Sequence, residues 1–344
     1  MTAVQQLIRK NIHQLAPYSS ARHEFVGSAE VFLDANENPN DTGYNRYPDP
    51  LQQAVKTALA KIKKVAAKHI FLGNGSDEVI DLLIRIFCEP RIDHILCLPP
   101  TYGMYKVSAS IADVAVKNIL LDTNFQPKVA EILATADAHS KLLFLCTPNN
   151  PTGNTFDRAK VSELLEKFEG IVVIDEAYID FDTAESYNQL LHNYPNLVVM
   201  QTFSKAWGLA AIRLGIAYAS EEIIHYLNKV KPPYNVNLLT QQAALEALRA
   251  EAQQRQWVAE IVAERERLLD LLPAFPFIEK VHDSSANFLL VKVHEPQELY
   301  DYLVQHQIIV RNRSNVPLCE GCLRITIGTK TENERLLKVL REKV

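Results

Sequence analysis

The chain has 344 residues, of which 47% are hydrophobic and 22% charged, and its formal net charge is −5. This balance is typical of a folded protein in water and disfavours disorder or a basic nucleic-acid-binding surface. Glycine is scarce, with 11 residues, which excludes collagen-like and low-complexity classes.

The N-terminal stretch up to Tyr18 mixes apolar residues with Gln5, Arg9 and Lys10. This pattern predicts a short amphipathic helix and no signal peptide. No apolar run approaches the roughly 20 residues that a membrane-spanning helix needs. We therefore expect a soluble protein.

Between about residues 69 and 219, short apolar runs alternate with amphipathic stretches, a pattern typical of α/β units around a mostly parallel sheet. The predicted strands are His69–Leu72, His94–Leu98, Val114–Leu120, Lys141–Cys146, Ile171–Ile174, Leu197–Gln201 and Leu214–Tyr218. The predicted helices are Asp77–Phe87, Arg158–Phe168 and Glu221–Lys229. Several strands are apolar on both faces, as in a sheet covered by helices on each side.

After a proline break at Lys231–Pro233, the sequence from Asn237 to Leu272 is helical in character. Beyond it we predict strands and helices of a smaller α+β domain: strands Phe288–Val293, Ile308–Val310 and Leu323–Ile327, and helices Pro296–Gln305 and Thr331–Glu342. We expect residues 31–238 to form the large domain. Residues 1–30 and 239–344 would form the small one, with the N-terminal helix packed there.

Five cysteines are present: Cys88, Cys97, Cys146, Cys319 and Cys322. An odd number in a chain of this length favours a reducing cytoplasm. The last two have C-x-x-C spacing, but the absence of a second pair disfavours a zinc site or redox centre, and we predict no metal.

Polar residues follow four of the predicted strands, and ligands of open α/β sheets bind outside the carboxyl ends of strands. We therefore expect one edge of the sheet to gather Gly73, Gly75, Ser76, Asp77, Asn150, Asp175, Tyr178, Thr202, Ser204 and Lys205. Gly75 and Ser76 open a helix whose N-terminus suits an anion, although the same residues also make an ordinary helix cap.

Lys205 and Asp175 are the residues with the strongest chemical implication. A lysine in an apolar pocket can act as a Schiff-base amine, whereas most lysines are simply solvated. A carboxylate that ends a buried strand needs a cation, a metal or several hydrogen-bond donors nearby, and a pyridinium nitrogen or Mg²⁺ would satisfy it. Together with an anion turn and the donors Asn150 and Tyr178, they form the set that pyridoxal phosphate requires.

The order of these groups resembles fold-type I aminotransferases. The matching segments are Asn-Asn-Pro-Thr-Gly (149–153), Asp-Glu-Ala-Tyr (175–178), Ser-Lys-Ala-Trp-Gly (204–208) and Arg213-Leu-Gly. The resemblance implies that Lys205 forms the Schiff base and transfers protons, that Asp175 keeps the ring nitrogen protonated, and that Asn150 and Tyr178 hydrogen-bond to the ring oxygen. It further implies that Tyr102 stacks on the cofactor ring and that the surroundings of the cofactor phosphate are Gly75, Ser76, Asp77, Thr202, Ser204 and Arg213. Tyr47 would reach the cofactor phosphate of the neighbouring subunit in a homodimer.

Further segments resemble the histidinol-phosphate aminotransferases, a class II subgroup of this fold: Leu-Ala-Pro-Tyr (15–18), Leu-Asp-Ala-Asn-Glu-Asn-Pro (33–39), Asn-Arg-Tyr-Pro (45–48) and Leu-Arg-Ile-Thr-Ile-Gly (323–328). The resemblance implies transamination between histidinol phosphate and 2-oxoglutarate in histidine biosynthesis. The implied substrate ligands are Arg324, Arg311, Tyr18, Asn36 and Asn150. We expect Arg313 to lie in an exposed basic loop.

Three alternatives stay open at this point. An aromatic-amino-acid aminotransferase or a threonine-phosphate decarboxylase would have nearly the same cofactor residues. A regulatory or binding relative without activity is disfavoured because Lys205, Asp175 and Arg324 are all present.

Overall fold

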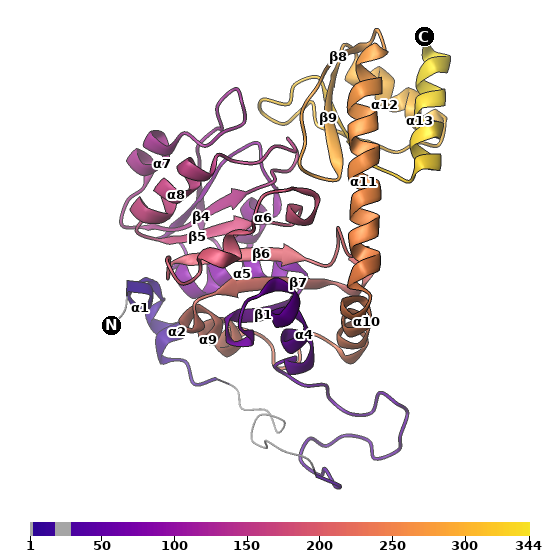
Figure 1. Ribbon diagram of the computed structural model, residues 1–344. Coiled ribbons are helices and arrows are strands. Elements are labelled where there is room, and N and C mark those ends of the chain that lie inside the picture. The colour runs from indigo at the N-terminus through magenta and orange to yellow at the C-terminus, as the bar shows by residue number, and fades with distance from the viewer. Residues whose placement is uncertain (1–2, 18–28) are drawn as a thin grey trace.

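The computed structural model describes residues 3–17 and 29–344, and its larger layer is a seven-stranded sheet with the order β1-β7-β6-β5-β4-β2-β3 (Figure 1). Its strands are β1 (Ile70–Asn74), β2 (His94–Cys97), β3 (Ala115–Asn118), β4 (Ser140–Cys146), β5 (Ile171–Asp175), β6 (Leu197–Thr202) and β7 (Leu214–Ala219). Only β7 runs antiparallel to its neighbours, β1 and β6. The predicted mostly parallel sheet is confirmed.

Successive residues of a central strand pack into different cores, as the period of two requires. Val172 and Ile174 of β5 belong to one hydrophobic cluster, whereas Ile171 and Val173 belong to another. The first cluster lies under α4 (Gln53–Lys63), α7 (Val129–Thr135), α8 (Arg158–Lys167) and α10 (Leu238–Arg249). The second lies under α5 (Ser76–Phe87), α6 (Met104–Ile111) and α9 (Glu221–Val230).

The N-terminal helices, α1 (Ala3–Leu7) and α2 (Lys10–Gln14), pack on the large domain, so the prediction that they join the small domain is wrong. Ile8 and Ile12 belong to the cluster formed by α5 and α9. Arg9 Nε lies 3.0 Å from Glu89, and His13 Nδ1 lies 2.7 Å from the Tyr226 hydroxyl. The amphipathic pattern indicated a buried face, but not the surface that buries it.

The smaller layer is a four-stranded antiparallel sheet with the order β10-β11-β9-β8. Its elements are β8 (Ile278–Val281), β9 (Phe288–Val293), β10 (Arg311–Asn312), β11 (Cys322–Thr326), α12 (Pro296–Gln305) and α13 (Lys330–Lys343). Thr329 and Glu332 form a capping box at the start of α13. The predicted strand Ile308–Val310 is wrong, because pairing with β11 begins at Arg311 and Ile309 is 73% exposed.

A long helix, α11 (Glu251–Leu271), runs from α10 beside the large sheet to the small sheet (Figure 1). The two sheets confirm the predicted combination of a large α/β part and a smaller α+β part, while the exact domain boundaries stay a prediction. Residues 29–52 contain neither a helix nor a strand. Among the described helices, none is long and apolar enough to cross a membrane.

Candidate active site

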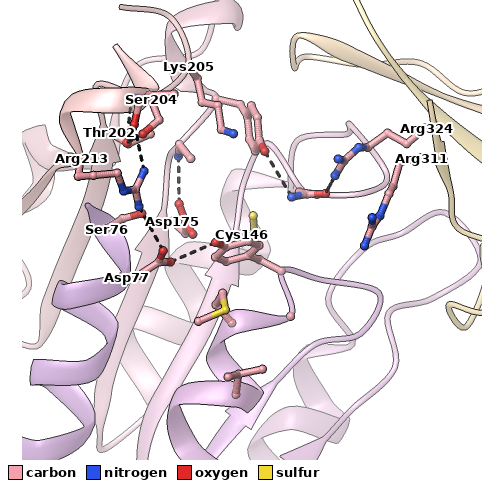
Figure 2. Close-up of a pocket in the computed structure, with 18 of the residues that line it drawn as sticks. Ser76, Asp77, Cys146, Asp175, Thr202, Ser204, Lys205, Arg213, Arg311 and Arg324 are labelled. Atoms are coloured by element: carbon pink, nitrogen blue, oxygen red, sulfur yellow. Dashed lines mark hydrogen bonds and ion pairs between the residues drawn. The ribbon is translucent and has the colours of Figure 1, made fainter. Parts of the chain in front are cut away.

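A cavity of about 620 Å³ opens where β1, β4, β5 and β6 end and β7 begins. Figure 2 shows its labelled side chains in two groups, with Ser76, Thr202, Ser204 and Arg213 on one side and Arg311 and Arg324 on the other. Lys205 and Asp175 lie between the groups. The small sheet therefore supplies one wall of the cavity, and the carboxyl ends of the large sheet supply the rest.

The turn before α5 provides an anion cradle. Gly75 has φ +74° and its N–H donates to the carbonyl of Arg213 at 2.8 Å, which brings the start of β7 against the helix N-terminus. Gly215 is required here, because a Cβ would lie 2.2 Å from Ser76 N. Amides, hydroxyls and the Arg213 guanidinium thus converge at the positive end of α5.

Asp175 is buried at the end of β5, with 3% of its surface exposed. One carboxylate oxygen accepts a hydrogen bond from the Tyr105 hydroxyl at 2.6 Å, and the other accepts one from Ala177 N at 3.1 Å. Burial raises the pKa of Asp175, and the Tyr105 hydrogen bond opposes that rise. Within the described part of the chain, no basic side chain pairs with this carboxylate. It therefore suits a cationic ligand group.

Lys205 points its amine into the same cavity, with Nζ 5.7 Å from the centre of the Tyr178 ring. Desolvation lowers the pKa of Lys205, and the positive charge of Arg324 lowers it further. A lower pKa increases the fraction of neutral amine at neutral pH, which is the form that attacks a carbonyl carbon.

A chain of hydrogen bonds links Tyr178, Asn150 and Arg324 in the cavity beside Lys205. Asn150 Nδ2 donates to the Tyr178 hydroxyl at 3.3 Å, and Arg324 Nη1 donates to Asn150 Oδ1. The Phe288 ring supports both ends, because it lies edge-to-face with Tyr178 and 5.2 Å from the Arg324 guanidinium carbon. These contacts fix the donors relative to Lys205.

Comparison with known proteins adds to this geometry. The model of the family described as aminotransferase class I and II matches residues 23–340. The chain belongs to the class I and II aminotransferases. It is 53% identical to the histidinol-phosphate aminotransferase of Cytophaga hutchinsonii, over 98% of this chain and 99% of that one, and 54% identical to that of Parabacteroides distasonis, over 99% of each chain. The solved histidinol-phosphate aminotransferase of Clostridium acetobutylicum is 26% identical, with a TM-score of 0.80 over 87% of this chain and 91% of that chain.

The aminotransferase cavity fits pyridoxal 5'-phosphate, the cofactor of its family. The buried carboxylate without a cation would meet the ring nitrogen, the amine of Lys205 would meet the carbonyl carbon, and the cradle at α5 would take the phosphate. Tyr102 lines the cavity, and its hydroxyl donates to Asp77 Oδ1 at 3.1 Å. All predicted cofactor residues except Tyr47 therefore lie in or directly beside one cavity.

Two residues of the aminotransferase site escaped the sequence reasoning. Arg313 was expected in an exposed loop, yet it is partly buried and lines the cavity beside Arg311 and Arg324. No motif in the sequence marks Tyr105, which lies in the first turn of α6, three residues after Tyr102, and meets the Tyr102 ring edge-to-face at 5.6 Å.

Three predicted ligands are not placed at the cavity. Tyr18 lies outside the described residues. Asn36 and Tyr47 line a separate hollow of about 470 Å³ together with Leu239. Neither Asn36 nor Tyr47 lines the larger cavity of its own chain, and their roles as ligands stay predictions.

Neither cysteine of the C-x-x-C pair is among the residues that line the cavity, and both are buried. Burial raises the pKa of Cys319 to about 12 and of Cys322 to about 11. A raised pKa favours the protonated thiol over the thiolate, which is the form that reacts and binds metals.

Proposed function

We propose that the aminotransferase moves an amino group from glutamate to imidazole acetol phosphate, giving 2-oxoglutarate and histidinol phosphate in histidine biosynthesis. The observation that carries this proposal is the guanidinium wall opposite the cofactor cradle, in a chain more than half identical to histidinol-phosphate aminotransferases. Histidinol phosphate carries a phosphate where glutamate carries its α-carboxylate. One wall of guanidiniums can hold either anion.

In this proposal the reaction proceeds in two half-reactions at the same residues. Bound pyridoxal phosphate supplies an electrophilic carbon and a cationic ring that accepts electron density from the substrate. Lys205 Nζ removes the proton from the substrate Cα and later returns one. Asp175 would keep the ring nitrogen protonated, and Asn150 and Tyr178 would donate to the ring oxygen.

Arg324 and Arg311 would bind the anionic end of each substrate and so orient its Cα toward Lys205. The Arg324 guanidinium is held by Asn150 and by the face of Phe288. A fixed guanidinium loses less conformational entropy when the anion binds, which favours correct positioning of the reacting carbon.

We also propose a homodimer in the cytoplasm with a shared active site. Tyr47 is 50% exposed and stacks on Tyr234 at 4.4 Å, and the same segment exposes Val31 and Leu33 at 70% and 91%. Apolar exposure of this kind favours burial against another chain. In a dimer, Tyr47 and its neighbour Asn36 would approach the partner's cavity.

A steady-state assay across amino donors tests the substrate proposal. The account predicts that histidinol phosphate is used far more efficiently than phenylalanine, and that threonine phosphate is not decarboxylated. Preferred use of phenylalanine, or release of CO₂ from threonine phosphate, would contradict it and support one of the two alternatives.

A further inference from the structure

Arg313 occupies a fixed position in the cavity wall. It follows β10 directly; its N–H donates to the carbonyl of Cys322 at 2.9 Å, and its own carbonyl accepts from Val316 N at 2.9 Å. Arg311 pairs in register with Arg324 across β10 and β11. Because Arg313 lies two residues after Arg311, extended geometry puts both on the same side of the chain. The hairpin thereby presents three guanidiniums to one cavity.

The guanidinium of Arg313 lacks a counter-ion in the described residues. Its Nε is buried and has no hydrogen-bond partner there, and the same is true of Arg324 Nε. No carboxylate of the described chain lies within ion-pair distance of Arg311, Arg313 or Arg324. Burial and the charges of Arg324 and Arg311 lower the pKa of Arg313. Unpaired like charges at close range are unfavourable unless an anion binds between them.

The two anions of the proposed reaction differ in what they require. A carboxylate carries one charge and accepts a bidentate pair from one guanidinium. A phosphate monoester carries about −1.5 to −2 charges at neutral pH and has three acceptor oxygens. Arg324 and Arg311 therefore suffice for glutamate, whereas the phosphate can use a third guanidinium.

We propose that Arg313 is a specificity-determining residue that favours the phosphate end of histidinol phosphate over the carboxylate of glutamate. The inference rests on the proposed function, because it assumes that both substrates use this wall. Arg313 then adds transition-state binding in one half-reaction only, which lets one cavity serve two anions of unequal charge.

The test measures kcat/KM of each half-reaction separately, with glutamate and with histidinol phosphate, in Arg313→Gln and in the holoenzyme of the native chain. Removing a charged hydrogen-bond donor should lower the value for histidinol phosphate by about tenfold to a hundredfold. The value for glutamate should change by no more than about threefold. Arg335→Gln, which removes an arginine of the small sheet's domain outside this cavity, is the matched control and should change neither.

Histidinol, which lacks the phosphate, isolates the contact. The preference for histidinol phosphate over histidinol should be smaller in Arg313→Gln than in the native enzyme. Arg313→Lys keeps the charge but not the planar guanidinium, so its preference should lie between those of the native enzyme and Arg313→Gln. Inorganic phosphate should also inhibit the glutamate half-reaction about tenfold less strongly in Arg313→Gln. This inhibition is a readout that does not depend on phosphate-substrate turnover.

The possible results distinguish a failure of the role of Arg313 from a failure of the proposed function. Equal losses on both half-reactions, or unchanged inhibition by phosphate, would overturn the role of Arg313 while leaving the proposed function intact. Absence of histidinol-phosphate turnover by the native enzyme would overturn both the proposed function and this inference.

Discussion

Tyr105→Phe tests how the protein controls the carboxylate of Asp175. The substitution removes the hydroxyl that donates to Asp175 at 2.6 Å. It keeps the ring, which stacks on Phe144 at 4.5 Å and meets Tyr102 edge-to-face at 5.6 Å. The packing of α6 on the sheet should therefore survive, and the change isolates one hydrogen bond.

The magnitude follows from the charge of the acceptor. A hydrogen bond to a charged group contributes about 1.5–3 kcal/mol, and one pKa unit corresponds to about 1.4 kcal/mol. The hydroxyl favours the ionised carboxylate, so its loss further raises a pKa that burial has already raised. Asp175 then holds a cationic ring nitrogen less strongly, and we expect a loss of about tenfold to a hundredfold in both cofactor affinity and kcat.

Two assays check this expectation. Titration of the apo-protein with pyridoxal phosphate measures the cofactor affinity, and the pH profile of kcat reports the ionisation of Asp175. Because protonation of Asp175 abolishes its pairing with the ring, the acid limb should move to higher pH in the variant. Tyr218→Phe is the matched control, since Tyr218 is equally buried and its hydroxyl has no hydrogen-bond partner among the described residues. Native affinity together with an unmoved acid limb in Tyr105→Phe would refute the reasoning.

Two further predictions concern the cradle and the amine. Gly215→Ala would place a Cβ 2.2 Å from Ser76 N and 2.3 Å from Gly75 C, both backbone atoms, so cofactor affinity should fall by at least about fivefold in an equilibrium titration; unchanged affinity would show that the turn yields freely. Arg324→Gln removes a positive charge that lowers the pKa of Lys205. The midpoint for modification of Lys205 in the apo-protein by an amine reagent, followed by mass spectrometry, should therefore move to higher pH, and a midpoint that stays or falls would contradict this.

The strands of the large sheet could be predicted because each is a short apolar run buried on two faces. Val172 and Val173 are adjacent yet enter different cores, so the run shows no polar face. Elements with weak patterns were missed: β8 has two charged residues in the middle, Glu279 and Lys280, and both are exposed. An apolar run alone was misleading at Ile309, which faces solvent.

The cofactor residues could be predicted for a topological reason. Parallel strands end at one edge, so Asn150, Asp175 and Lys205 converge although they are far apart in sequence. Arg313 and Tyr105 could not be assigned in this way. Whether an arginine in a basic loop faces a cavity depends on the register of β10 on β11, and whether a tyrosine meets Asp175 depends on how α6 packs. The roles expected for Tyr47 and Asn36 depend on where a second chain lies in the proposed dimer, and local sequence does not determine that position.

The most direct test of the central claim is transamination by Lys205→Ala, followed together with the absorbance of covalently bound cofactor. The account predicts the loss of both, because no other amine in the described cavity lining can replace Lys205. Lys231→Met is the matched control: burial lowers the pKa of Lys231 to about 8, but its amine donates to the carbonyl of Pro50 at 2.8 Å outside the cavity. That variant should keep the absorbance. Unchanged transamination of histidinol phosphate by Lys205→Ala would contradict the account.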